Sequence, residues 1–103
     1  MNNVQVVDKR GNVKRYNEQG KLHCENGPAI ERVNGDKEWY FNGKRHRVNG
    51  PAVERINGEK IWYFNGRLHC TDGPATVLFT GIKFFYLNGK RLNEEQFNTR
   101  RFK

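Results

Sequence analysis

Short runs of β-branched and aromatic residues recur along this chain, and polar pairs that favour turns separate them. Two such runs, PAIERV (28–33) and DKEWYF (36–41), flank the pair Asn34-Gly35. An Asn-Gly pair between two strand-like runs predicts a β-hairpin, because a type I′ turn needs positive φ at both central residues. The pattern therefore predicts antiparallel strands joined by tight turns.

The hairpin recurs with a period of 23 residues from Gly20 to Leu92, around Asn57-Gly58 and then Thr80-Gly81. Three sets of residues stay in register through the copies: Trp39, Trp62 and Phe85; Tyr40, Tyr63 and Tyr86; His23, His46 and His69. A degenerate copy precedes them, in which Val7, Lys14 and Tyr16 align with Ile30, Lys37 and Trp39.

A fixed period over most of the chain predicts one repeat domain rather than several domains. We predict a single domain over 1–103, with a degenerate repeat (1–19), repeats 20–42, 43–65 and 66–88, and a C-terminal cap (89–103). The fold class is all-β, an elongated antiparallel meander of 23-residue β-hairpin repeats.

Two-residue turns would fix the strand register and therefore the two faces of the sheet. With such a turn at Asn34-Gly35, Ile30 lies opposite Trp39. One face then carries Ile30, Arg32, Lys37, Trp39 and Phe41, and the other carries Ala29, Glu31, Val33 and Tyr40.

The C-terminal tail predicts a short capping helix. Asn93 followed by Gln96 has the spacing of an N-cap and capping box, and two acids fill the first turn. We expect a helix from about Glu94 to Arg101 that docks Phe97 on the last repeat.

The charge of the chain points to an anionic partner. The sequence has 103 residues and a net charge of +8, with 35% hydrophobic and 13% aromatic residues. A few large rings must therefore supply the core, and a basic surface suits an acidic protein patch or a polyanion.

The phrase WYFNGKRHRVNGPAVERINGEK (39–60) resembles MORN repeats, and most closely the variant form of some bacterial antitoxin-like proteins. Its His-x-x-x-Gly-Pro-Ala version is similar to repeats in small proteins of phages, large viruses and bacteria. The resemblance covers residues 20–92. It implies an elongated sheet used for protein contacts, in some members for dimerisation, with a debated affinity for phospholipid, and it implies no catalysis.

The repeated histidines and the two cysteines do not predict a metal site or a disulfide. His23-Cys24 and His69-Cys70 stand two repeats apart. At about 4.8 Å per strand, they are separated by roughly 20 Å, too far for zinc ligation or for an S–S bond. We interpret each histidine as structural, packing on an aromatic ring and bonding a turn carbonyl, with ligand contact as the alternative.

No acid, base or nucleophile recurs or converges in a way that supports catalysis. We therefore expect no catalytic residues, no metal and no cofactor, and a protein that is not an enzyme.

The candidate binding residues are aromatic and basic positions that recur with the period. They are Arg32, Lys37, Trp39, Lys44, Arg45, His46, Arg47, Arg55, Lys60, Trp62, Arg67, Lys83, Lys90 and Arg91. Two interpretations of the aromatic stripe stay open: it is either the core of the sheet or an exposed binding face.

Our leading hypothesis is a non-catalytic interaction module that binds an acidic surface of a protein partner. A specific case is a phage-type inhibitor of a host enzyme or defence complex. The alternative is a protein that binds single-stranded nucleic acid or another polyanion through the aromatic and basic face. A homodimer also stays open.

The chain shows no signal peptide and no apolar stretch of membrane-spanning length, so we expect no membrane insertion. Two cysteines fit a reducing compartment better than a disulfide scaffold. The expected location is the cytoplasm, or the host cytoplasm for a viral protein.

Overall fold

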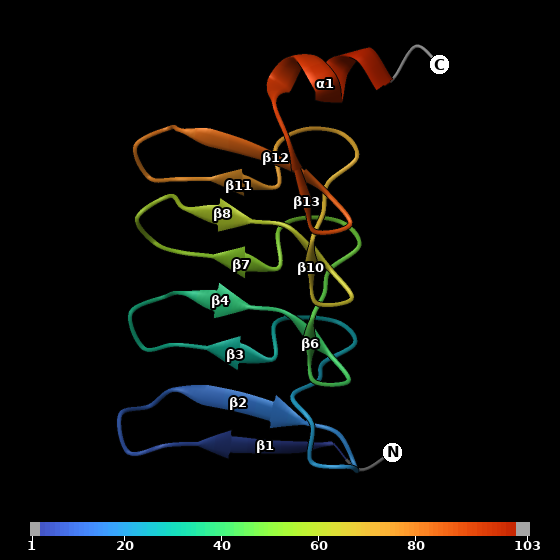
Figure 1. Ribbon diagram of the computed structural model, residues 1–103. Helices are drawn as coiled ribbons and strands as arrows, with labels where there is room; N and C mark the ends of the chain where they lie inside the picture. The colour runs from blue at the N-terminus through green and yellow to red at the C-terminus, as the bar shows by residue number, and fades with distance from the viewer. Residues whose placement is uncertain (1–2, 101–103) are drawn as a thin grey trace.

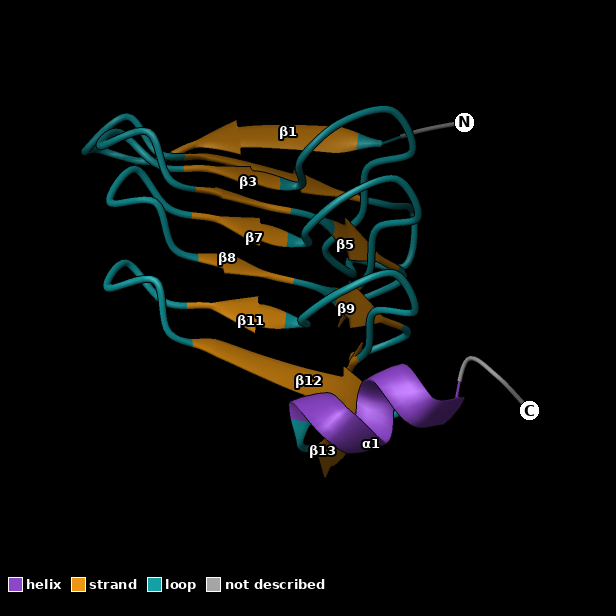
Figure 2. Cartoon of the chain, turned by 90° about the horizontal axis from the view of Figure 1, so that it is seen from above, coloured by secondary structure: helices purple, strands orange, loops and turns teal. Residues whose placement is uncertain are grey.

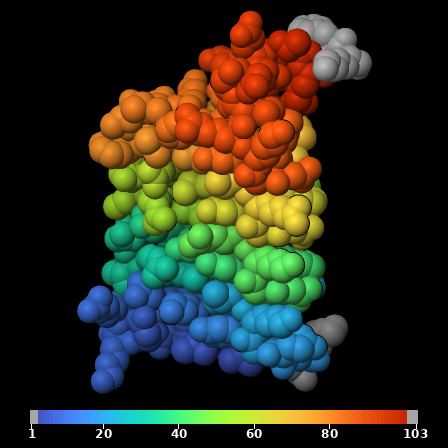
Figure 3. Space-filling view, viewed as in Figure 1, coloured from blue at the N-terminus to red at the C-terminus, as the bar shows by residue number. Residues whose placement is uncertain are grey.

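The computed structural model describes residues 3–100, which form a stack of β-hairpins with a short helix at the C-terminal end (Figure 1). The molecule measures 46 × 29 × 17 Å, so the sheet is elongated. In the space-filling view the repeats follow one another as successive bands along the long axis (Figure 3). The predicted all-β meander with a capping helix is confirmed.

Nine strands form one antiparallel sheet in the order β1-β2-β3-β4-β7-β8-β11-β12-β13. Their bounds are β1 (Val4–Val7), β2 (Val13–Tyr16), β3 (Ile30–Glu31), β4 (Lys37–Glu38), β7 (Val53–Glu54), β8 (Lys60–Ile61), β11 (Thr76–Val77), β12 (Lys83–Leu87) and β13 (Lys90–Leu92). Two ribbons lie beside this sheet, β5 (Tyr40–Phe41) with β6 (Lys44–Arg45), and β9 (Tyr63–Phe64) with β10 (Arg67–Leu68).

The first turn of each repeat has three residues instead of the predicted two. The Arg32 N–H donates to the Asp36 carbonyl at 2.9 Å, and Gly35 has a φ of 101°. This is the geometry of a type I turn followed by a glycine bulge. Ile30 therefore lies opposite Glu38, and the predicted pairing of Ile30 with Trp39 is wrong by one residue.

A two-residue turn is instead formed by the Asn-Gly pair that follows the second strand of each hairpin in the three full repeats. Asn42 and Gly43 have φ angles of 50° and 83°, the positive values that a type I′ turn requires. The equivalent pairs Asn65-Gly66 and Asn88-Gly89 have the same geometry. The sequence contains the expected turn, but after the second strand of each hairpin.

A slip of one residue moves side chains to the opposite face of a sheet. Trp39 and Trp62 share a face, as predicted, but Ile30 and Arg32 lie on the other one. The tryptophan face carries a row of alternating rings and alanines: Ala29, Trp39, Ala52, Trp62, Ala75 and Phe85. The isoleucine face carries Ile30, Glu38, Val53, Ile61, Thr76 and Phe84.

The degenerate first hairpin is also offset by one residue from its predicted alignment. Lys14 lies beside Ile30 in the sheet and so takes the place of Glu38, not of Lys37. The cause is a longer second turn, in which Asn17 N–H bonds the Lys21 carbonyl across three residues. The extra residue moves the whole first hairpin by one position against the period.

On the tryptophan face of the sheet, the alanines are more deeply buried than the rings. Ala29, Ala52 and Ala75 are 0% exposed, whereas Trp39 and Trp62 are only half-buried. Ala52 and Ala75 each lie between two rings of this row, and Ala29 lies between Trp39 and Arg15. The aromatic stripe is therefore neither a closed core nor a free face.

The helix α1 (Glu94–Thr99) covers β12 and β13 at the end of the stack (Figure 2). Asn93 and Gln96 form the predicted capping box, and Phe97, 1% exposed, packs on Phe85 with ring centroids 4.8 Å apart. The predicted last residue, Arg101, lies outside the described residues. Within residues 3–100, no helix has the length and apolar character to cross a membrane.

Candidate functional site

A column of alternating histidine and phenylalanine rings runs along the stack. The ring centroids of His23 and Phe41 are 4.4 Å apart, those of Phe41 and His46 are 6.0 Å apart, and the next repeat continues the series with Phe64 and His69. The predicted packing of histidine on an aromatic ring is therefore present.

The histidine hydrogen bond runs in the opposite direction from the predicted one. His23 Nδ1 accepts from the Asn42 N–H at 3.0 Å, and His46 and His69 accept in the same way from Asn65 and Asn88. An accepting Nδ1 places the proton of the neutral ring on Nε2. Each histidine thus holds the type I′ turn of the following repeat.

Four exposed cations form a second column beside these rings: Lys21, Lys44, Arg67 and Lys90. The stems of Lys21, Lys44 and Arg67 rest on the glycine of the next turn: a Cβ on Gly43 would lie 3.5 Å from the Lys21 Cβ. Equivalent positions are two strands apart, hence about 10 Å. We call these four residues the basic edge.

Three cations of the basic edge have no ion-pair partner within residues 3–100. Among the described residues, Lys44, Arg67 and Lys90 take part in none of the ion pairs of the structure. Lys44 pairs across the ribbon with Phe41, and Arg67 with Phe64, so the cations lie next to half-exposed rings. Three of the predicted binding residues therefore form one continuous exposed surface.

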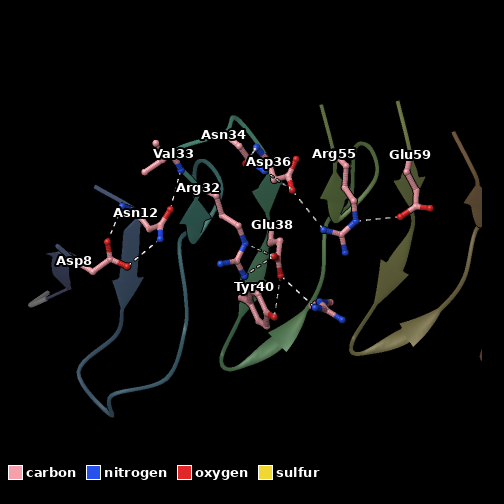
Figure 4. Close-up of polar contacts among 11 residues, drawn as sticks. Asp8, Asn12, Arg32, Val33, Asn34, Asp36, Glu38, Tyr40, Arg55 and Glu59 are labelled. Atoms are coloured by element: carbon pink, nitrogen blue, oxygen red, sulfur yellow. Dashed lines mark hydrogen bonds and ion pairs between the residues drawn. The ribbon is translucent and has the colours of Figure 1, made fainter. Parts of the chain in front are cut away.

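Other predicted binding cations are used inside the fold. Glu38, 2% exposed, accepts from Arg32 Nη2 at 2.9 Å, from Arg45 Nη2 at 3.2 Å and from the Tyr40 hydroxyl at 3.3 Å. Figure 4 shows Arg32 and Tyr40 turned toward the Glu38 carboxylate. Arg32 and Arg45 thus balance a buried charge.

Burial raises the pKa of the Glu38 carboxyl, but the hydrogen bonds and charges of Arg32 and Arg45 lower it by more. The net pKa lies below its ordinary value of 4.5. Sequence reasoning missed Glu38. The clue was that the period places Ile61 and Phe84 at its position in the next two repeats.

Arg55 is also part of an internal network. It lies 3.6 Å from Asp36 and 3.1 Å from Glu59 (Figure 4). Asp36 accepts from the Ile56 N–H at 2.9 Å, and this bond is the main cause of its lowered pKa. Asp36 therefore ties the tip of the β3-β4 hairpin to the tip of the β7-β8 hairpin, and Arg55 stabilises the link.

Lys37, Lys60 and Lys83 are exposed on the tryptophan face. The strand register places Lys37 between Glu31 and Glu54, and Lys60 beside Glu54. Positive and negative side chains therefore alternate in this part of the face. Arg91 stacks on Phe84 at 4.4 Å from the ring centroid. These cations are weaker candidates for an acidic partner than the basic edge.

Two grooves cross the tryptophan face between the Gly-Pro loops of successive repeats. The first groove, about 600 Å³, contains Trp39, Phe41 and His46. The second groove, about 820 Å³, contains Trp62, Phe64 and His69, between loops 47–51 and 70–74. Trp39, His46 and Trp62, three predicted binding residues, thus line grooves.

Arg47 makes the two grooves chemically different. Its guanidinium lies 3.9 Å from the Trp39 ring centroid and pairs with Glu54 at 2.9 Å. At the equivalent place beside Trp62 the chain has Cys70. Arg47 lines both grooves, but it covers the tryptophan only in the first; among residues 3–100, no arginine stacks on Trp62, so the ring of the second groove is open.

Metal ligands do not gather in the part of the chain that the structure describes: no three His, Cys, Asp or Glu side chains form a cluster there. Cys24 and Cys70 are half-buried free thiols. The surface features that remain are the basic edge and the open groove.

Because comparison with known proteins finds no match, any functional argument rests on the fold and the surface of the chain. No protein-family model, no curated protein and no solved structure matches it. The resemblance to MORN repeats rests on the repeated phrase alone and stays a prediction.

Proposed function

We propose that this protein is a non-catalytic interaction module that binds an acidic surface of a partner protein through its basic edge. The observation that carries the proposal is the column of exposed cations, of which Lys44, Arg67 and Lys90 have no ion pair among residues 3–100. Exposed charges contribute about 0.2–1 kcal/mol each and mainly accelerate association. Several exposed cations at a fixed spacing also add specificity, because a partner must match that spacing.

The spacing of the basic edge suggests the form of the acidic surface. The cations recur about every 10 Å along a straight stack. Two turns of an α-helix rise about 10.5 Å over seven residues. A helix with a carboxylate at every seventh position therefore matches the column, one carboxylate to each cation.

Single-stranded nucleic acid is the second candidate, and the half-exposed Phe41 and Phe64 beside the cations favour it. Stacking needs free ring faces, however. Each of these rings packs between two histidines, tilted by 57–58°, and Arg47 covers Trp39. These contacts favour an acidic protein over a run of stacked bases.

The test compares two charge-reversal pairs. Lys44→Glu/Arg67→Glu changes the basic edge, and Lys9→Glu/Lys83→Glu changes net charge equally at exposed positions elsewhere. Binding to a helical peptide with Glu at every seventh position is measured by fluorescence anisotropy at three salt concentrations. We expect at least tenfold weaker binding for the first pair, about 1.4 kcal/mol or more, and a small change for the second.

Equal losses for the two pairs would reject the basic edge as the binding site. Tighter binding of an oligothymidylate than of the peptide would instead support the nucleic-acid alternative. Reversal of Arg45 or Arg47 is a poor test, because both arginines hold internal carboxylates.

The inhibitor hypothesis uses the same surface, the basic edge, as the site that contacts the partner. An enzyme partner would be inhibited by occupancy, with one molecule of this protein inactivating one molecule of enzyme. A titration that ends at an equimolar ratio supports this form of the proposal, and inhibition that grows with time at substoichiometric amounts opposes it. The free thiols fit the proposed cytoplasmic location.

A homodimer stays a second proposal, located at β1. This strand has one strand neighbour in the described sheet, and Val4, Val6 and Val7 are 46–58% exposed. An uncharged open edge favours pairing with another strand. We expect self-association that rises with salt and is lost in Val6→Lys, as measured by sedimentation velocity. A monomer at all salt concentrations rules it out.

A further inference from the structure

A proline precedes the first strand of each of the three later hairpins: Pro28, Pro51 and Pro74. Their carbonyls occupy equivalent sites, and two of them bind a guanidinium. Arg15 Nη1 donates to the Pro28 carbonyl at 2.9 Å and to Glu31 Oε2 at 2.6 Å. Arg47 Nη1 donates to the Pro51 carbonyl at 3.1 Å and to Glu54 Oε2 at 2.9 Å. The same site is thus filled by arginines from two different positions of the repeat.

The third site, at Pro74, has neither the arginine nor the glutamate. Cys70 stands at the position of Arg47, and Val77 at the position of Glu54. Among the described residues, no side chain covers Gly73 as Arg47 covers Gly50. A Cβ on Gly50 would meet the Arg47 guanidinium at 3.1 Å, but a Cβ on the equivalent Gly73 would meet nothing within 4 Å.

The second groove combines this space with an aromatic ring and a carboxylate. Trp62, Gly73 and Pro74 line it, and no arginine of residues 3–100 lies over Trp62 as Arg47 lies over Trp39. Asp72 also lines it, whereas the equivalent residues in the other repeats are Asn26 and Asn49. The second groove thus contains a carboxylate although Val77 stands at the position of Glu54.

We propose that the second groove binds a guanidinium group, in the form of an arginine side chain of a partner protein. The guanidinium stacks on Trp62, donates to the Pro74 carbonyl and pairs with Asp72. A planar cation with several donors suits this combination better than an ammonium, which offers no flat face to the indole. The chain itself shows the fit, because Arg47 makes the same kinds of contact with Trp39 and Pro51.

The inference goes beyond the proposed function, since it concerns other residues and a ligand of opposite charge. The basic edge collects carboxylates, and the second groove accepts one cation. A partner that offers both groups is oriented as well as bound, because the two sites lie at fixed positions on one rigid stack.

The test uses N-acetyl-arginine amide as the probe and NMR of the backbone amides and indole N–H groups as the readout. We expect saturable shifts at the Trp62 indole and the Gly73 amide, with affinity in the millimolar range. The Trp39 indole is an internal control, because Arg47 already covers that ring. The neutral citrulline analogue should bind at least fivefold more weakly.

Variants that exchange the repeats provide matched controls. Cys70→Arg/Val77→Glu copies the preceding repeat into the third site, and it should fill the groove and abolish the shifts at Gly73. Arg47→Cys/Asn49→Asp/Glu54→Val copies the third site into the second repeat, and it should create new probe-dependent shifts at Trp39. Asp72→Asn should weaken binding severalfold without affecting the fold, since Asp72 makes only a long contact with the Thr71 hydroxyl among the described residues.

Three results would overturn the proposal: shifts of equal size at both indoles, equal binding of the citrulline analogue, or full binding by the folded Cys70→Arg/Val77→Glu protein. None of these variants changes the basic edge. Binding of the acidic peptide therefore reports on the proposed function independently of the groove.

Discussion

One repeat position shows how a single residue can change the role of its neighbours. Glu38 is a buried carboxylate, and the same position holds Ile61 and Phe84 in the next repeats. Removing a charge from water is unfavourable unless partners compensate, so Arg32, Arg45 and Tyr40 are turned inward around it. Two arginines that look available for a partner in the sequence are thereby used in the fold.

Replacing Glu38 with Gln should therefore lower the free energy of unfolding by about 3 kcal/mol at pH 7, because two arginines lose their counter-charge. Urea denaturation measures the change. Glu59→Gln is the matched control: Glu59 pairs with Arg55 at a more open site, and its loss should cost about 1 kcal/mol or less. Equal losses in the two variants would contradict a special role for the buried carboxylate.

Glu38→Gln also gives a prediction for the stability of the fold at acidic pH. A carboxyl whose folded pKa is lowered stabilises the fold above its unfolded pKa, and this contribution disappears as the pH falls through the folded pKa. The pKa of Glu38 lies below 4.5. The stability difference between the wild type and Glu38→Gln should thus be full at pH 6 and shrink as the pH falls below about 4.5. A difference that stays constant down to pH 3 would contradict the lowered pKa.

At the scale of the hairpin, the sequence predicted the elements but not their register. The period, the strand-like runs and the capping box at Asn93 led to the correct fold class and helix. Asn34-Gly35 and Asn42-Gly43 look alike, and the local sequence does not show that the first pair belongs to a three-residue loop. Val33, 63% exposed, is the first residue of that loop rather than the last residue of a strand.

This register error explains which of the predicted binding residues are exposed and which are used inside the fold. Lys44 and Arg67 follow the two-residue turns at Asn42-Gly43 and Asn65-Gly66, away from the misassigned loop, and they are exposed. Arg32 lies next to the misassigned turn, and the correct pairing brings it onto Glu38. Contacts between repeats, such as Arg47 on Trp39, depend on how the hairpins stack and have no local sequence pattern.

The turn geometry itself can be tested with two glycines. Gly58 has a φ of 96°, and a methyl group on its Cα would meet no atom within 4 Å, so Gly58→Ala isolates backbone strain. It should cost about 1 kcal/mol. Gly27 has equally open surroundings without a positive φ, and Gly27→Ala should be neutral or stabilising by a few tenths of a kcal/mol. Thermal denaturation of both variants gives the comparison, and equal melting temperatures would argue against the bulged turn.

At the scale of the whole molecule, the two ends of the stack differ. The first end exposes the valines of β1, whereas the last repeat is covered by α1. Arg100 reaches from the end of this helix to the Thr71 carbonyl at 2.7 Å, and it stacks on Phe97. The helix therefore also fixes the loop that forms one wall of the second groove.

Phe97→Ala should consequently affect one end of the molecule more than the other. Removing a fully buried ring costs about 3–5 kcal/mol, and in a repeat stack each unit contacts only its neighbours. We expect hydrogen exchange to accelerate first in β12, β13 and loop 70–74, while β2 to β4 keep their protection. The exposed Asn98→Ala, on the same helix, is the control and should leave exchange unchanged.

The functional consequence of Phe97→Ala separates the two binding surfaces. With loop 70–74 loosened, the guanidinium probe should bind more weakly, because Asp72 and Pro74 no longer hold their positions beside Trp62. Lys44 rests on the turn of the following repeat, farther from the helix, so acidic-peptide binding should change less. Uniform loss of protection along the chain would show that the hairpins unfold as one unit, and it would remove the physical basis for treating the groove and the basic edge as independent sites.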